Sequence, residues 1–190
     1  MRVYTLAPQG DPELANVVDT VAFLNLSARL QREGAGPDDH WSEWDVEQAL
    51  ANVTVRLYDR EVDGSVRWPA DAPWHSSMDL FVKDTVDPVF AGTSARLLPV
   101  ACESTALRYV LPPIVPALDV ERSVLSLMPG SGRVIGVKEP VFKTSVVAQH
   151  PVFKDGSLKC ESLIYVTETF VDRWKRAGLR GLEFEEVWRG

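Results

Sequence analysis

The sequence predicts an α+β fold, in which a mainly antiparallel or mixed sheet is covered by a few short helices. Segments with strand-like patterns outnumber those with helical patterns along the 190 residues, and that length suits one domain with its own core. A strand–helix–strand pattern also occurs twice, near residues 80–100 and 163–187. We therefore predict a single domain over residues 1–190, in which these units pack their helices against a sheet.

The clearest unit covers residues 163–187. Residues 163–166 are apolar, β-branched or aromatic, which favours a buried strand, and Thr167 follows as a helix N-cap whose hydroxyl can accept a backbone N–H. The next apolar side chains recur at helical spacing: Phe170, Val171, Trp174 and Ala177. Gly178 can take the left-handed conformation that ends a helix. Alternation of acidic and apolar residues from 182 to 187 then predicts a closing strand.

A second copy of this unit begins at residue 80. Residues 80–86 match residues 164–170 in residue type at nearly every position, and the chain again runs through a glycine, Gly92, to an apolar run at 97–100. Pro88 lies inside the expected helix and removes one of its hydrogen bonds. We therefore expect that helix to be limited to one or two turns.

Other elements follow from the same patterns. Alternating or β-branched runs predict strands at 2–6, 22–30, 53–58, 107–111, 124–128, 134–137, 141–143 and 151–154. An aspartate followed by proline predicts a short helix over residues 12–18, and Ser42 begins a second helix whose buried stripe reaches residue 53. Glycine-containing turns predict a hairpin around residues 63–64 and a turn at 130–132.

The acidity of the chain is concentrated in its first third. The net charge is −7; residues 1–70 hold 12 acidic and 6 basic side chains, whereas residues 71–190 hold 15 and 14. Nucleic-acid binding requires a basic face, so this balance argues against it and favours a basic protein partner. A solvated acidic flank that maintains solubility would explain the same charges.

The sequence contains no targeting or membrane-spanning signal. No apolar run approaches the ~20 residues that a membrane span needs, and the first ten residues lack the apolar core of a signal peptide. We interpret the two cysteines as reduced thiols. We therefore expect a cytoplasmic protein with no membrane partner, and the oligomeric state stays open.

Aromatic and acidic residues gather between residues 38 and 47. Tryptophan supplies binding energy at interfaces, and carboxylates steer a basic partner. The candidate partner-binding residues are Asp38, Asp39, Trp41, Glu43, Trp44 and Glu47. A purely structural interpretation explains most of them as well, because Trp41 can pack on Val46 at a helix start and the acids complement the helix dipole. That interpretation leaves only an outward-facing Trp44 unexplained.

The sequence contains no recognisable catalytic motif. Its histidines lie in no metal-ligand spacing with the cysteines, and neither a phosphate-binding loop nor a nucleophile elbow is present. We therefore expect no catalytic residue, metal or cofactor. One alternative is a small enzyme with a dispersed site, for which Cys160, His150 and Glu161 are the nearest candidates. A zinc site would have to be assembled from Cys102, Cys160, His75 and His150. A further alternative is a peptide-binding module that uses an exposed strand edge.

Four motifs along the chain carry a family resemblance. The C-terminal one is the run Ile-Tyr-Val-Thr-Glu-Thr-Phe at 164–170, continued by Trp-Lys-Arg-Ala-Gly-Leu-Arg-Gly-Leu-Glu-Phe-Glu-Glu-Val-Trp at 174–188. The other three are Leu80-Phe81-Val82 with Leu98-Pro99-Val100, the stretch from Tyr109 through Asp119 to Ser123, and Pro151-Val152-Phe153-Lys154 preceded by His150. Together these motifs resemble the immunity-protein family numbered eleven of bacterial polymorphic toxin systems, formerly a domain of unknown function.

The resemblance covers residues 75–188 as a family-like core and leaves the acidic N-terminal part, residues 1–70, unmatched. It implies a cytoplasmic, non-catalytic protein that binds a cognate secreted toxin domain and blocks it. The family supplies no catalytic residues to carry over. The excess of acidic charge before residue 70 makes that part the expected contact surface, and a basic toxin such as a nuclease would suit it.

Overall fold

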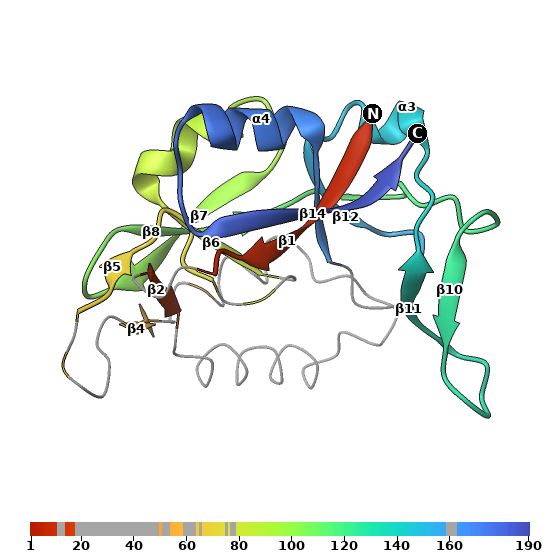
Figure 1. The fold of residues 1–190 in the computed structure, drawn as a ribbon, viewed down its shortest axis with the longest axis horizontal. Helices are drawn as coiled ribbons and strands as arrows, with labels where there is room; N and C mark the ends of the chain where they lie inside the picture. The colour runs from red at the N-terminus through yellow and green to blue at the C-terminus, as the bar shows by residue number, and fades with distance from the viewer. Residues whose placement is uncertain are drawn as a thin grey trace.

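The structure is a computed structural model that describes residues 1–10, 14–17, 50, 54–58, 64, 66–74, 76, 79–158 and 163–190. Within these residues, short helices pack on β-sheets of five, four, three and two strands, which confirms the predicted α+β class (Figure 1). The strands are β1 (Arg2–Pro8), β2 (Leu14–Val17), β3 (Thr54–Val55), β4 (Leu57–Tyr58), β5 (Trp68–Pro69), β6 (Leu80–Lys83), β7 (Arg96–Cys102), β8 (Leu107–Leu111), β9 (Ile114–Val115), β10 (Val124–Leu127), β11 (Val134–Glu139), β12 (Val152–Asp155), β13 (Ile164–Thr167) and β14 (Leu182–Arg189). The helices are the 3-10 helix η1 (Asp84–Phe90), α3 (Thr144–Val147) and α4 (Glu168–Arg176).

The five-stranded sheet brings the two ends of the chain together. Its order is β14-β1-β13-β12-β9, so the first strand lies between the last two and is antiparallel to both. Val3 pairs with Thr167 on one side and with Trp188 on the other. The fold of this sheet therefore depends on contacts between residues at opposite ends of the sequence.

The predicted repeat is present as two strand–helix–strand units of the same connectivity. In one unit, β6 and β7 flank β8, which is antiparallel to both; in the other, β13 and β14 flank β1 in the same way. The first helix is the 3-10 helix η1 with Pro88 inside it, so it is as short as the proline predicts.

The helices of the two units pack against each other over a shared core. The rings of Phe90 in η1 and Phe170 in α4 lie 5.1 Å apart between centroids, and Figure 1 shows both helices on the same side of the sheets. Fifteen buried residues form the cluster beneath them, including Leu6 of β1, Val110 of β8 and Trp174 of α4. One core thus joins the five-stranded sheet to the four-stranded sheet β3-β7-β8-β6.

One prediction near the N-terminus is wrong. Residues 14–17 form strand β2 and not part of a helix over 12–18, because Leu14 is buried and β2 pairs on both sides, with β4 and with β5. Tertiary pairing overrides the local pattern there. The predicted hairpin around residues 63–64 stays a prediction, because most of its residues lie outside the described ones.

Most other predicted elements are confirmed. β1, β8, β10, β11 and β12 lie where alternation predicted strands, and β3 and β4 occupy the predicted strand at 53–58 with a break at Arg56. The sequence did not predict α3, which has only four residues. The predicted strand at 22–30 lies outside the described residues, as does the predicted helix after Ser42 apart from Leu50, which is helical and 2% exposed.

No helix in the described parts of the chain is long and apolar enough to cross a membrane.

Candidate functional site

The sequence predicts six partner-binding residues. All six lie outside the part of the chain that the structure describes. They are Asp38, Asp39, Trp41, Glu43, Trp44 and Glu47. Their role as a contact surface stays a prediction. Leu50, the nearest described residue, is buried against Val55 and Leu98.

The residues of the alternative enzyme and zinc sites are only partly described. Cys160, Glu161 and His75 lie outside the described residues, while His150 follows α3 and Cys102 ends β7. Among the described residues, no group of three or more histidine, cysteine, aspartate or glutamate side chains is placed to hold a metal ion. The alternative site of His150, Cys160 and Glu161 therefore stays a prediction.

The strongest pKa shift within the core belongs to a structural tyrosine. Burial raises the pKa of Tyr109 well above its ordinary value, and the charge of Asp79 and the hydrogen bond to it act in the same direction. The Tyr109 hydroxyl donates to Asp79 Oδ1 at 2.8 Å, and the ring packs edge-on against Phe81. This pair ties β8 to the residue before β6, and nothing in its surroundings suggests chemistry.

The exposed residues Glu186 and Arg189 shift each other's pKa through a hydrogen bond between their side chains. A side-chain hydrogen bond from Arg189 lowers the pKa of Glu186, and the same contact raises the pKa of Arg189. Two nitrogens of the guanidinium, Nε and Nη2, donate to the two carboxylate oxygens, at 2.8 and 3.0 Å. This bidentate pair lies on the last strand and stabilises its end locally.

The hairpin of β10 and β11 is a projecting part of the molecule. We call it the β10–β11 ribbon (residues 124–139). Figure 1 shows it projecting from the body at the end opposite β5. In the described sheets, β10 and β11 pair only with each other. No side chain from residue 121 to residue 140 is buried. A two-stranded hairpin of this kind is marginally stable by itself, so its root must hold it.

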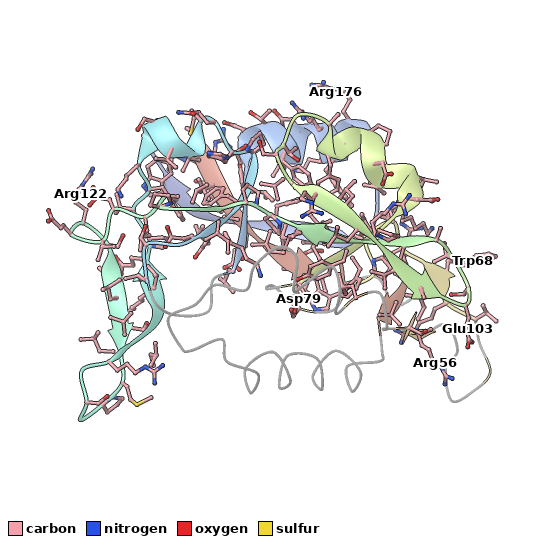
Figure 2. The ribbon with its side chains drawn as sticks, turned by 180° about the vertical axis from the view of Figure 1, so that it is seen from behind. Arg56, Trp68, Asp79, Glu103, Arg122 and Arg176 are labelled. Carbon is pink, nitrogen blue, oxygen red and sulfur yellow. The ribbon has the colours of Figure 1, made fainter. Side chains whose placement is uncertain are left out.

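The root of the ribbon is anchored firmly in the core. Leu118 and Phe142 form a β-bridge and are 1% and 2% exposed. One step outward, the Ser123 hydroxyl donates to the Asp119 carbonyl at 2.7 Å and accepts the Val141 amide at 2.9 Å. Arg122, at the edge of the molecule in Figure 2, makes a surface ion pair with Asp119. The chain therefore leaves the body in a fixed direction.

The ribbon has an inner and an outer side. Leu125 pairs with Val137 across the strands, and both pack against the core cluster that contains Phe142. The register shifts twice, which leaves Ile135 and Lys138 as extra residues of β11. Such bulges turn a side chain away from the regular alternation, and both residues are exposed.

The ribbon exposes several large apolar side chains. They are Val124 at 44%, Leu127 at 54%, Met128 at 43% and Ile135 at 53%. Strand β10 carries no charged residue, and natural proteins place charges on such edges to prevent unwanted pairing. Exposed apolar side chains on a projecting element make the ribbon a candidate contact surface.

The sequence predicted both strands and the turn of this ribbon, but not the exposure of its apolar side chains. The turn is held by the Met128 amide on the Arg133 carbonyl, with Gly130 and Gly132 at positive φ. The available signal was the run Val124-Leu125-Ser126-Leu127-Met128, which is apolar on both faces although a half-buried strand needs only one.

No protein-family model matches the sequence, and no curated protein matches it either. The resemblance to the immunity-protein family therefore stays a prediction.

Proposed function

We propose that this chain is a non-catalytic immunity protein, which binds a cognate secreted toxin domain and blocks it by occlusion. The observation that carries the proposal is the β10–β11 ribbon, whose exposed apolar residues stand on a projecting hairpin with an anchored root. A protein that inhibits by covering its target needs such a surface and needs no catalytic group. The motif resemblance of residues 75–188 supplies the class of partner.

Two parts of the chain would divide the work of recognition. The ribbon offers apolar contact area, which dominates the affinity at the centre of an interface. The acidic residues between 38 and 47 would steer a basic toxin toward it and accelerate association. Residues 121–140 hold three basic and two acidic side chains, so the ribbon itself does not repel a partner of either sign.

Co-expression with the toxin encoded by the adjacent gene tests this function. The wild-type chain is expected to restore growth and to co-purify with the toxin domain. Growth arrest in the presence of soluble, folded chain, with no co-purifying toxin, would contradict the proposal. Simultaneous charge reversal of Asp38, Asp39, Glu43 and Glu47 then tests the acidic surface, which is wrong if rescue survives unchanged.

The ribbon is tested by the double variant Leu127→Asp with Ile135→Asp. Both side chains are exposed, so the fold should survive while the apolar contact is lost. Ile114→Asp is the matched control, because Ile114 is also an isoleucine in a strand and 44% exposed, but it belongs to β9 and not to the ribbon. We expect the double variant to lose rescue and the control to retain it.

Peptide binding is a second candidate function, and the open edge of β10 favours it. An extended segment could add to that edge as a further strand, with backbone hydrogen bonds supplying the affinity. A competition experiment distinguishes peptide binding from inhibition of a folded toxin domain. An unfolded, protease-derived peptide of the toxin should displace the intact toxin under peptide binding but not under occlusion of a folded domain.

A further inference from the structure

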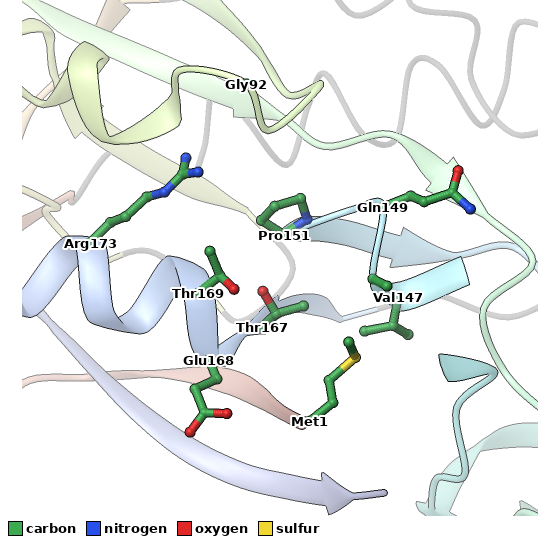
Figure 3. A pocket seen from close by; sticks show the side chains of 10 residues that line it. Met1, Gly92, Val147, Gln149, Pro151, Thr167, Glu168, Thr169 and Arg173 are labelled. Carbon is green, nitrogen blue, oxygen red and sulfur yellow. The ribbon is translucent and has the colours of Figure 1, made fainter. Parts of the chain in front are cut away.

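A cavity of about 370 Å³ lies at the N-terminal end of α4, and none of its lining residues belongs to the ribbon. It is bordered by the residues that begin α4, by the end of α3, by Pro151 and by Gly92 after η1 (Figure 3). Its volume is within the range of small-molecule sites. Its walls combine apolar side chains with several hydrogen-bond donors.

Thr167 is the unusual residue of this cavity. It occupies the N-cap position of α4, yet its side chain makes no capping hydrogen bond, and within the described residues its hydroxyl has no other partner. The residue is nevertheless only 4% exposed. The small part of Thr167 that stays accessible borders the cavity, where a ligand could form a hydrogen bond with the hydroxyl.

Further donors converge on the same space. The amide hydrogens of the first turn of α4 have no acceptor within the helix, and the Thr167 side chain does not cap them. Figure 3 shows the hydroxyl groups of Thr167 and Thr169 turned toward each other beside the cavity. Arg173, one turn further on, donates Nη1 to the Ala91 carbonyl at 2.8 Å and keeps further guanidinium donors for a ligand.

The charges around the cavity favour an anion. Arg173 and the positive end of the α4 dipole both attract negative charge. The one acidic residue that lines the cavity is Glu168, and Arg2 holds its carboxylate at 3.3 Å. The apolar wall formed by Val147, Ala148 and Pro151 suits a ligand with an organic part as well as an anionic group.

We propose that this cavity binds a small organic phosphate. The phosphoryl oxygens accept from the Thr167 and Thr169 hydroxyls, from the free amides of the α4 N-terminus and from Arg173, while the organic part lies against Val147 and Pro151. A phosphoryl group offers three terminal oxygens to these three kinds of donor, whereas a carboxylate offers only two.

The test is a titration of ¹⁵N-labelled protein with glycerol phosphate, inorganic phosphate and acetate at constant ionic strength. The amide signals of Thr167, Glu168 and Thr169 should shift saturably, with glycerol phosphate binding more tightly than inorganic phosphate and acetate binding weakest. Signals that do not saturate in the millimolar range overturn the proposal. Equal shifts with acetate overturn it as well, because they indicate a general ion effect.

Variants identify the donors. Thr167→Val is close to isosteric and should weaken glycerol phosphate binding at least about tenfold, with an unchanged unfolding midpoint because the hydroxyl makes no hydrogen bond to any described residue. Thr169→Ala, at an exposed position, gives a second variant should Thr167→Val fail to fold. Arg173→Gln should weaken binding similarly, and Arg176→Gln is its matched control, since Arg176 projects to solvent from the same helix (Figure 2). Undiminished binding in all three cavity variants would overturn the assignment.

Discussion

Two glycines that follow α4 are required for different physical reasons. Gly178 has φ +67° and nothing within 4 Å of the position that a Cβ would occupy. Gly181 has φ +113°, and a Cβ there would lie 2.3 Å from the Ala72 carbonyl oxygen. Its amide also donates to the Gln9 side chain at 2.7 Å. Gly178 therefore needs only its backbone conformation, whereas Gly181 needs both the conformation and the space.

Alanine substitution separates these two requirements. Gly178→Ala should lower the free energy of unfolding by about 1–2 kcal/mol, the cost of a left-handed residue with a Cβ. Gly181→Ala should cost clearly more, because the backbone of residue 72 must also move. Urea denaturation of the two variants beside the wild type measures both. Equal losses would mean that the contact with Ala72 is not tight in solution.

Tyr109 should make stability depend on pH in the alkaline range. Burial, followed by the charge and hydrogen bond of Asp79, raises its folded-state pKa, so the folded protein holds the phenolic proton more tightly than the unfolded chain. Its stabilisation is therefore complete below about pH 10, the ordinary tyrosine pKa, and is lost as the pH rises above that value.

The variant Tyr109→Phe checks this dependence. It should be less stable than the wild type near neutral pH by about 1–3 kcal/mol, because Asp79 loses a donor. Its stability should then fall less between about pH 9 and pH 11 than that of the wild type. Parallel slopes in denaturation measurements over that range would contradict the raised pKa.

Among the helices and strands, α4 shows which features a local sequence pattern can predict. Its start at Thr167 and its end at Gly178 were predictable because N-caps and C-terminal glycines act locally. The C-terminal end of α4 has both backbone hydrogen bonds expected of a glycine cap. The Leu179 amide donates to the Trp174 carbonyl at 3.4 Å, and the Gly178 amide donates to the Lys175 carbonyl at 3.1 Å. Thr167 is the N-cap residue as predicted, but the predicted hydrogen bond from a helix amide to its hydroxyl does not form.

Elements near the N-terminus could not be predicted, because distant strands decide them. Residues 14–17 carry the cap and proline of a helix start just before them, yet β2 becomes the central strand between β4 and β5. A local pattern contains no information about a partner some 50 residues away. The same limit applies to the candidate site. The sequence shows apolar residues on both faces of β10, but their exposure depends on which other elements pack against the ribbon.

The β10–β11 ribbon should be the least protected ladder among the described strands. None of its side chains is buried, while all four residues of β13 are. Amides of the ribbon should therefore exchange with deuterium much faster than those of β13. Hydrogen exchange followed by mass spectrometry checks this. Protection equal to that of β13 at low protein concentration would contradict a free ribbon.

At the scale of the whole molecule, one core serves both repeated units. Residues from β1, β8, β13 and both helices meet in a single cluster, and the rings of Phe90 and Phe170 join the two helices within it. That arrangement is what the predicted single domain requires. The ribbon lies outside this cluster and rests on a separate one through Leu125 and Val137. Changes on its outer side should therefore alter binding while leaving the main core intact.

The proposed contact between the ribbon and a toxin domain can be measured by calorimetric titration. The purified toxin domain is titrated into three forms of the chain: the wild type, the Leu127→Asp and Ile135→Asp double variant, and the Ile114→Asp control. We expect equal affinity for the wild type and the control, and binding at least about 100-fold weaker for the double variant, because each buried apolar anchor contributes on the order of 2 kcal/mol. Wild-type affinity in a folded double variant would contradict it.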